Sequence, residues 1–496
     1  MSTTTIASLP EEILLTIFEY LDSPPPSQLK SRLEPTLDLT KSNNHIYKSI
    51  SQVSHLWRRI ILPLLFRYSR LRLDVPPRKE WSECSACGEH QPASTTIDHP
   101  VDEHHNPLFA TAYKNINTAT ANHSEHSPSR GPNFILSTLH WASRIHHSLT
   151  DYLAFLQRNN LPASIHSFAL LTNCMIEESQ HRFPHRMAAT YDYRYRAAAD
   201  LWHQLFKAVP GLKRVVIVAP PADLACLTNC AIDLFGDWAF EDMGFHVLEV
   251  RVDSSPLTNN ATPRGTVHGY GQLYAHEVIS STATIPSYVP AEYPGVAPSS
   301  ILKIRAWSHL SLNEGSFLRA YGTYEYFERG PPSLIYSIKD CVSSNRRAWR
   351  PHSQSCMDLS ALKSFTYTAI LPFANHCDFR GLLPYIDELD IKLAPDPTSG
   401  ILQDKDRVGK AELEDCWSEF FHAYRAITKP FRTFEIRKDG TPKLKKFICR
   451  DVSTPALVYE LDEEFVPLCL PVWAEMEPGV FVRRETYPPS YGPEIM

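Results

Sequence analysis

The chain has 496 residues, 43% of them hydrophobic and 21% charged, and its formal net charge at pH 7 is −6. This length allows a sizeable core and roughly two to four domains, and a sequence without a basic excess argues against nucleic acid as the main partner. The N-terminus lacks the features of a secretory signal, no stretch approaches the ~20 apolar residues of a membrane span, and eleven scattered cysteines suit reduced thiols, so we expect a soluble cytoplasmic or nuclear protein without membrane contact.

Residues 8–21, SLPEEILLTIFEYL, predict an amphipathic helix. Ser8 and Glu11 have the spacing of a capping box, and Pro10 is tolerated in a first turn because its missing N–H needs no partner there. Three prolines at 24–26 end the helix. One face is apolar at steps of three or four residues: Leu9, Ile13, Leu14, Ile17, Phe18 and Leu21.

Residues 44–66 form a second helical pattern. Its apolar face comprises Ile46, Ile50, Val53, Trp57, Ile61 and Leu64. Between the two patterns lies a long polar stretch with several prolines, and we expect it to bulge out as a loop before Leu37–Leu39 rejoins the helices.

The two patterns together resemble the F-box, a family of small three-helix modules that dock on the Skp adaptor of cullin–RING ubiquitin ligases. The family's Leu-Pro pair falls on Leu9 and Pro10, and its Val-Ser-x-x-Trp-Arg stretch on Val53, Ser54, Trp57 and Arg58. The resemblance covers residues 8–66, its middle stretch is longer than the family's, and we assign an F-box to residues 1–70. It implies adaptor contacts through Leu9, Pro10, Ile13, Ile17, Phe18, Leu21, Val53 and Trp57.

Residues 67–75 alternate apolar and charged side chains and predict a strand. Residues 82–133 are rich in Ser, Thr, His, Asn and Pro without periodicity, which predicts a disordered polar insert. The insert contains Cys84 and Cys87, but a zinc site needs a second close-spaced pair of ligands, and the nearby histidines are poorly spaced. We therefore expect no metal and no cofactor.

Residues 134–496 predict many short strands separated by helices and loops. A helix is expected over 134–157, followed by a strand at 164–173, a helix at 197–209 and a buried strand after the Pro-Gly turn at 210–211. Further strands are expected at 245–253, 301–307, 361–371, 386–394 and 431–439, helices at 317–327 and 412–426, and irregular loops at 254–300 and 343–356. Asp439-Gly440 predicts a hairpin turn, and residues 456–473 predict closing strands.

This order of elements resembles the degenerate leucine-rich solenoids that follow F-boxes in fungal proteins, although no regular leucine-rich period is present. The predicted fold class is α+β: a three-helix F-box, then a curved α/β leucine-rich-repeat-like solenoid over 134–496. A large α/β domain with a mixed sheet is the alternative.

No catalytic motif is found in the sequence: Gly-x-Ser-x-Gly, a phosphate-binding glycine loop and His-Glu-x-x-His are all missing. The resemblance implies a non-catalytic substrate-recognition subunit of an SCF-type ubiquitin ligase, with a Skp-type adaptor and through it a cullin as partners, and an unidentified protein as its target. The alternative function is an enzyme or ligand-binding domain that carries an F-box for turnover or localisation.

Overall fold

The structure is a computed structural model of the whole chain. It describes residue 6 and residues 9–41, 45–73, 148–172, 188–230, 243–253, 300–322, 330–342, 361–432, 444–464, 466–469 and 472–484, with short pieces between 81 and 92 and between 232 and 240. The fold is mixed α/β and is built on one open sheet of ten strands, so the expected mixture of helices and strands is confirmed.

The N-terminal part is helical, with one main pair of helices, α1 (Glu11–Glu19) and α4 (His55–Phe66), and the short helix α3 (Ile46–Ile50) beside α4. The first predicted helix is confirmed. The second predicted helix is divided in two, because Ser54 is extended and its side-chain oxygen accepts a hydrogen bond from the Trp57 N–H at 3.2 Å. That bond makes Ser54 the N-cap of a new helix.

The strands of the main sheet follow one another in space in the order β1, β4 to β10, β12, β11. They are β1 (Tyr68–Leu73), β4 (Ser167–Thr172), β5 (Arg214–Ala219), β6 (His246–Arg251), β7 (His309–Ser316), β8 (Ser364–Ile370), β9 (Glu388–Lys392), β10 (Lys446–Cys449), β11 (Trp473–Glu477) and β12 (Val480–Arg483). Neighbours are parallel except that β6 is antiparallel to β5 and β7, and β12 is antiparallel to β10 and to β11.

The parallel strands begin at one level without stagger. Ser167 lies opposite Tyr68 and Arg214 on its two sides, and Glu388 lies opposite Ser364 and Lys446. An unstaggered register keeps a sheet open, since closing a barrel requires a fixed shear between strands.

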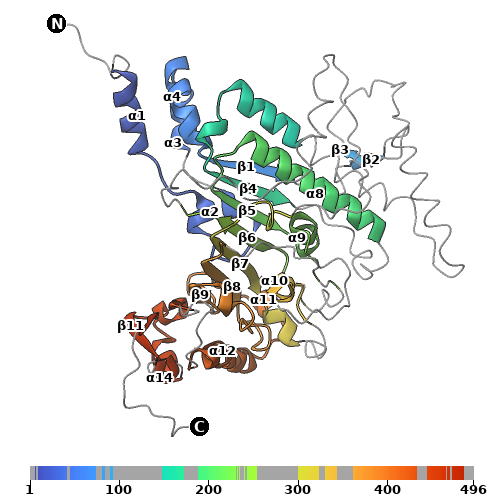
Figure 1. Cartoon of the computed structure of the whole chain (residues 1–496), viewed down its shortest axis with the longest axis vertical. Helices are drawn as coiled ribbons and strands as arrows, with labels where there is room; N and C mark the ends of the chain where they lie inside the picture. The colour runs from blue at the N-terminus through green and yellow to red at the C-terminus, as the bar shows by residue number, and fades with distance from the viewer. Residues whose placement is uncertain are drawn as a thin grey trace, which may run out of the picture.

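Both faces of the central strands are buried. On β5, Val215 and Ile217 belong to the large core under the helices, while Val216 and Val218 belong to a smaller cluster on the opposite face. Figure 1 shows α8 and α9 on the first side, which we call the helix face, and α2 on the other. Residues 148–158 are also helical, and short 3₁₀ helices include η2 (Leu37–Thr40) and η10 (Lys429–Arg432). The remaining described helices are α2 (Pro26–Leu29), α8 (Ala188–Ala208), α9 (Pro221–Thr228), α10 (Ile335–Val342), α11 (Lys405–Val408), α12 (Leu413–Thr428), α13 (Val458–Glu464) and α14 (Val466–Cys469).

Two sequence predictions about elements are wrong. Residues 301–307 form turns rather than a strand, because Trp307 folds back and donates its ring N–H to the Ile301 carbonyl at 2.7 Å; the strand is β7, just beyond. Residues 458–464 and 466–469 form α13 and α14 instead of closing strands.

Other predictions fall on parts of the chain without a description. The loops 254–299 and 343–356 and the turn at Asp439-Gly440 lie outside the described residues. Within the predicted insert, only the backbone of a two-stranded ribbon is described, β2 (Trp81–Glu83) with β3 (His90–Pro92).

The stretch between α1 and α3 does not bulge into solvent. Residues 26–41, which we call the strap, lie on the sheet face opposite the helices, which we call the strap face (Figure 1). The prediction of a projecting loop is therefore wrong, because buried side chains of the strands hold this segment, as described below.

Candidate functional site

The N-terminal helices have a small core of their own. Leu14, Ile61 and Leu64 are buried between α1 and α4. Phe18 is only 2% exposed, and its ring meets that of Trp57 edge to face at 5.3 Å. These contacts fix the two helices against each other and orient the rest of their apolar side chains.

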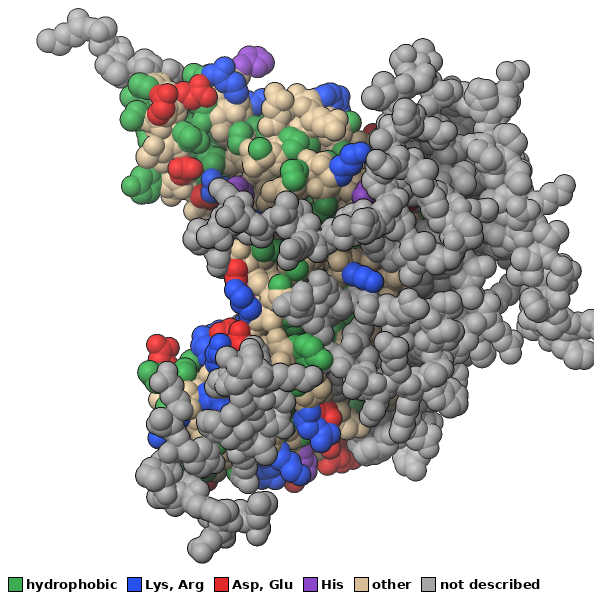
Figure 2. All heavy atoms as spheres, in the orientation of Figure 1, with side chains coloured by type: hydrophobic (Ala, Val, Ile, Leu, Met, Phe, Trp, Pro, Cys, Tyr) green, Lys and Arg blue, Asp and Glu red, His purple; other side chains and the backbone are tan. Residues whose placement is uncertain are grey.

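Many apolar side chains of these helices remain in solvent. Ile13 is 48% exposed, Val53 is 61% exposed and Leu21 is 40% exposed. Figure 2 shows hydrophobic side chains gathered on the N-terminal helices. The exposed set on this module comprises Ile6, Ile13, Leu15, Tyr20, Leu21, Ile46, Val53 and Leu56. Exposed apolar groups at this density mark an interaction surface.

The eight predicted adaptor-contact residues fall into three groups by exposure. Pro10, Ile13, Leu21 and Val53 are exposed, and Leu9, Ile17 and Trp57 are half-buried against the small core. Phe18 belongs to that core, so it supports the surface from beneath rather than offering a contact. The exposed aromatic ring of Tyr20 was not selected from the sequence, although it directly precedes Leu21.

The strap joins this module to the sheet through buried polar side chains. The Arg214 guanidinium donates to the Ser27 side chain and carbonyl, both at 3.1 Å, and the Asn313 amide donates to the carbonyls of Ser31 and Leu33 at 2.8 and 2.7 Å. Arg214 and Asn313 are both buried. Each would lose hydrogen bonds without the strap, and unpaired buried polar groups are costly.

An ion pair holds the far point of the strap. Arg32 donates both terminal nitrogens to the Asp390 carboxylate, at 2.8 and 2.5 Å, and Arg450 donates to the same carboxylate from the other side at 2.9 Å. Burial raises the pKa of Asp390, but the hydrogen bonds and charges of the two arginines outweigh burial and hold it below its usual value. Asp390 is thus ionised and shared at neutral pH.

Apolar contacts complete the attachment. Leu39 is buried on the strap face with Ala169, Leu171, Val216, Val218 and Val247. Pro35 lies close to Gly315, where a Cβ would come within 3.1 Å of the proline ring, and the Gly315 backbone adopts φ +78 at a bulge in β7. Arg407 pairs with Glu34. The strap is therefore an integral layer of the fold, and it runs out to β9 and back to β1.

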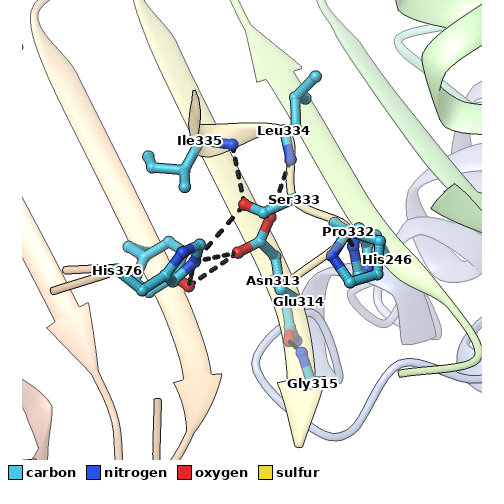
Figure 3. A network of polar contacts seen from close by, with 10 residues as sticks. His246, Asn313, Glu314, Gly315, Pro332, Ser333, Leu334, Ile335 and His376 are labelled. Atoms are coloured by element: carbon cyan, nitrogen blue, oxygen red, sulfur yellow. Dashed lines mark hydrogen bonds and ion pairs between the residues drawn. The ribbon is translucent and has the colours of Figure 1, made fainter. Parts of the chain in front are cut away.

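A second polar cluster lies on the helix face (Figure 3). It combines a carboxylate, a histidine and two hydroxyl groups, which are the residue types of many catalytic sites. Glu314 accepts hydrogen bonds from the hydroxyl of Ser333 at 2.5 Å and from that of Tyr367 at 2.8 Å, and its other neighbour is His376, whose Nε2 lies 2.9 Å from the carboxylate. The Leu334 N–H also donates to Glu314 at 3.1 Å. The carboxylate therefore sits at the start of α10, where the helix dipole favours a negative charge.

The geometry of this cluster suits a structural clamp better than a catalytic triad. Ser333, Glu314 and the Tyr367 hydroxyl all converge on the Nε2 side of His376, whereas a triad needs the nucleophile and the acid on opposite ring nitrogens. Glu314 and His376 have no solvent exposure. The cluster therefore links β7, β8 and α10 inside the core.

Electrostatics keep Glu314 ionised. Burial raises its pKa, but the hydrogen bond and charge of His376, the charge of His246 and the hydrogen bond from Ser333 outweigh burial and lower the pKa to about 2. Sequence analysis missed this residue because it assigned the strand to 301–307. The pattern Leu310-x-Leu312 followed by Asn-Glu-Gly was the available signal.

Cys84 and Cys87 lie outside the described residues, so the prediction about metal at that pair is not addressed by the structure. Among the residues with a description, no group of three or more potential ligands is placed to hold a metal ion. None of the described helices is long and apolar enough to cross a membrane.

Comparisons of the chain with family models, with curated proteins and with solved structures found no match. A function is therefore inferred from the residues of this chain and from their geometry.

Proposed function

We propose that this chain is the substrate-recognition subunit of an SCF-type cullin–RING ubiquitin ligase. Its N-terminal helices would bind a Skp-type adaptor as an F-box, and its sheet domain would bind the protein to be ubiquitinated. The observation that carries this proposal is the exposed apolar surface around Ile13, Leu21 and Val53, on two helices that also carry the Leu-Pro and Val-Ser-x-x-Trp-Arg sequences.

The energetics of such a surface favour a partner. Burying one Leu or Ile side chain contributes ~1.5–3 kcal/mol. Three or four such side chains together offset much of the entropic cost of docking. The small core beneath the surface holds these side chains in place before binding.

The sheet supports a leucine-rich-repeat-like domain in two respects. Its strands are neighbours in chain order from β4 to β10, and the parallel strands start at one level, as stacked repeat units do. The antiparallel strand β6 departs from a regular solenoid of parallel strands. The proposal is thus a degenerate, solenoid-like arrangement in which helices cover one face.

The mechanism is proximity. The strap fixes the N-terminal helices to the sheet through Arg32, Arg214 and Asn313, so a protein bound to the sheet domain is held at a set position relative to the ligase. Orientation and effective concentration of a target lysine are what such a subunit contributes.

The alternative is an enzyme or ligand-binding α/β domain fused to an F-box. The Glu314 cluster is its strongest support, but its members are buried and converge on one nitrogen of His376. Turnover of a small molecule by purified protein, lost in a His376→Ala variant that still folds, would favour this alternative.

The test is co-purification with a Skp-type adaptor. Ile13→Glu combined with Val53→Glu places charges in the exposed surface and leaves the small core intact, so we expect adaptor binding to be lost while circular dichroism is unchanged. The matched control is Tyr459→Glu with Met476→Glu, two apolar side chains outside the module that are more exposed than Ile13 and Val53, and this variant should bind like wild type. Adaptor binding that survives the first variant, or no binding by wild type, contradicts the proposal.

A truncation is a poor test of this function. Removal of residues 1–66 would also remove the strap and expose buried groups such as Asn313, Asp390 and Leu171. Point substitutions on the exposed surface avoid that damage.

A further inference from the structure

The strap face carries more bases than acids, although the whole chain has the opposite balance, with 49 Lys and Arg against 55 Asp and Glu. Alternation along the strands places every second side chain on this face. On β1, on β4 to β10 and on the strap, its bases are Lys30, Arg32, Lys41, Arg70, Arg72, Arg214, Arg251, Lys392 and Lys446, and its acids are Glu34, Asp38, Glu249, Glu388 and Asp390.

Asp38 is 64% exposed in its pair with Lys41, but the other acids of this face are more hidden than most of its bases. Asp390 is 4% exposed and lies between Arg32 and Arg450, and Glu249 is largely buried in its pair with Arg214. Arg251 is exposed. Lys446 pairs with Glu388 at 3.1 Å and keeps 40% of its side chain in solvent, and Arg450 pairs with Asp390 and keeps 47%. A molecule that approaches this face therefore meets mainly positive charge.

Apolar side chains stand among these charges. Leu29 is 67% exposed and Leu33 is also exposed, four residues apart on the outer side of the strap, while the strap's inner side faces the sheet. Figure 2 shows that the molecule is hollowed between the N-terminal helices and the C-terminal strands, with basic and acidic side chains on its surface there. Apolar groups beside cations fit a peptide better than a nucleic acid, whose backbone presents no apolar side chains.

We propose that the strap face binds an extended protein segment that carries both acidic and apolar side chains. This inference rests on the proposed function and names the chemical class of the target. Acidic side chains would meet Arg251, Lys446 and Arg450, and apolar ones would cover Leu29 and Leu33. Complementary charge of this kind speeds association and selects among partners.

The probe is a fluorescent peptide of about ten residues in which Glu alternates with Leu and Ser, long enough to cross several strands spaced about 4.8 Å apart. Two matched probes replace Glu by Lys, or replace the peptide by a single-stranded oligonucleotide of similar length. Fluorescence anisotropy with the full chain should show binding of the acidic peptide only, and this binding should weaken as salt screens the charges.

The variant Arg251→Glu with Lys446→Glu should weaken binding of the acidic peptide by about tenfold, because two exposed ion pairs are lost and replaced by repulsion. The control Arg158→Glu with Lys207→Glu reverses two exposed charges on the helices and should change binding by less than about twofold. Equal binding of the acidic and basic peptides, preference for the oligonucleotide, or equal effects of the two variants would overturn the inference.

The two proposals fail separately. The Arg251 and Lys446 variant leaves the N-terminal surface untouched, so it should bind a Skp-type adaptor like wild type. If the adaptor binds and the acidic peptide does not, only the inference about the target is wrong. If the peptide binds and the adaptor does not, the ligase function is wrong and the peptide site stands alone.

Discussion

Two buried carboxylates, one on each face of the sheet, join elements that are distant in the chain. Glu314 is paired under the helices, and Asp390 is paired under the strap. Each accepts several hydrogen bonds, and each would be an uncompensated buried charge without its partners. Both have a pKa below the usual value, so their contributions to stability have the same sign of pH dependence.

Glu314→Gln should lower the free energy of unfolding by about 3 kcal/mol at pH 7, because it leaves His376 and Tyr367 without the charge they are arranged around. Urea unfolding measures this loss, and the exposed Glu477→Gln is the control, with an expected change within about 0.5 kcal/mol. A lowered folded-state pKa means that the contribution of Glu314 is present above about pH 4.5 and is lost as the pH falls toward 2. A Glu314→Gln variant as stable as wild type at pH 7 would show that the cluster is not a clamp.

Arg32→Ala should cost about 1–2 kcal/mol at pH 7, less than a fully buried pair, because Arg450 still neutralises Asp390. Because the pKa of Asp390 is lowered in the folded state, the stability that this ion pair contributes is present at pH values above the ordinary pKa of an aspartate. That contribution is lost as the pH falls and the carboxylate becomes protonated. The control is Arg380→Ala, which removes an exposed arginine that also contacts an aspartate with two nitrogens. Equal losses of unfolding free energy in the two variants would mean that the contact between Arg32 and Asp390 adds nothing to stability beyond that of an exposed ion pair.

At the scale of elements, the strap is the feature that converts a helical module and a sheet into one body. Its two ends lead into α1 and α3, and its middle reaches Asp390 on β9 and Asn313 on β7. Regular alternation along β7 places consecutive side chains on opposite faces, so Asn313 meets the strap while Glu314 enters the core. One strand therefore serves both polar clusters.

Gly315→Ala tests how closely the strap fits. Gly315 has φ +78 and a Cβ there would lie 3.1 Å from the Pro35 side chain, whereas Gly400 has φ +65 with open space around it. Each substitution should cost about 1 kcal/mol through backbone strain, and Gly315→Ala should cost more and increase proteolytic cleavage within residues 26–41. Equal costs and equal cleavage for the two variants would show that Pro35 is not pressed against the sheet.

Periodicity predicted the elements whose local pattern was strong. The helices at α1 and α12 and the strands β4, β5, β6, β8 and β9 lie where alternation or helical spacing placed them. Residues 301–307 had a strand pattern as well, but Ile301 and Leu302 are buried in turns by the fold-back of Trp307. The path of the strap could not be read locally, because it depends on partners such as Asn313 and Asp390, almost three hundred or more residues away in the chain.

The exposed apolar surface was only partly predictable. Helical spacing groups Ile13, Phe18 and Leu21 on one side, yet only packing against α4 decides that Phe18 is buried and Ile13 is exposed. The same limit applies to charge, since the sequence is acidic overall and the basic strap face emerges only when alternate strand positions are brought together.

At the scale of the whole molecule, the strap fixes the N-terminal helices to the sheet. Under the proposed function these helices are the adaptor-binding module, and under the further inference the strap face is the site for an acidic target. The most direct measurement is size-exclusion chromatography with light scattering of the full 56.4 kDa chain mixed with a purified Skp-type adaptor. The account predicts a single peak whose mass is that of one chain plus one adaptor, and it predicts two separate peaks when Ile13 and Val53 are both replaced by Glu. Two separate peaks for the wild-type chain would contradict the account.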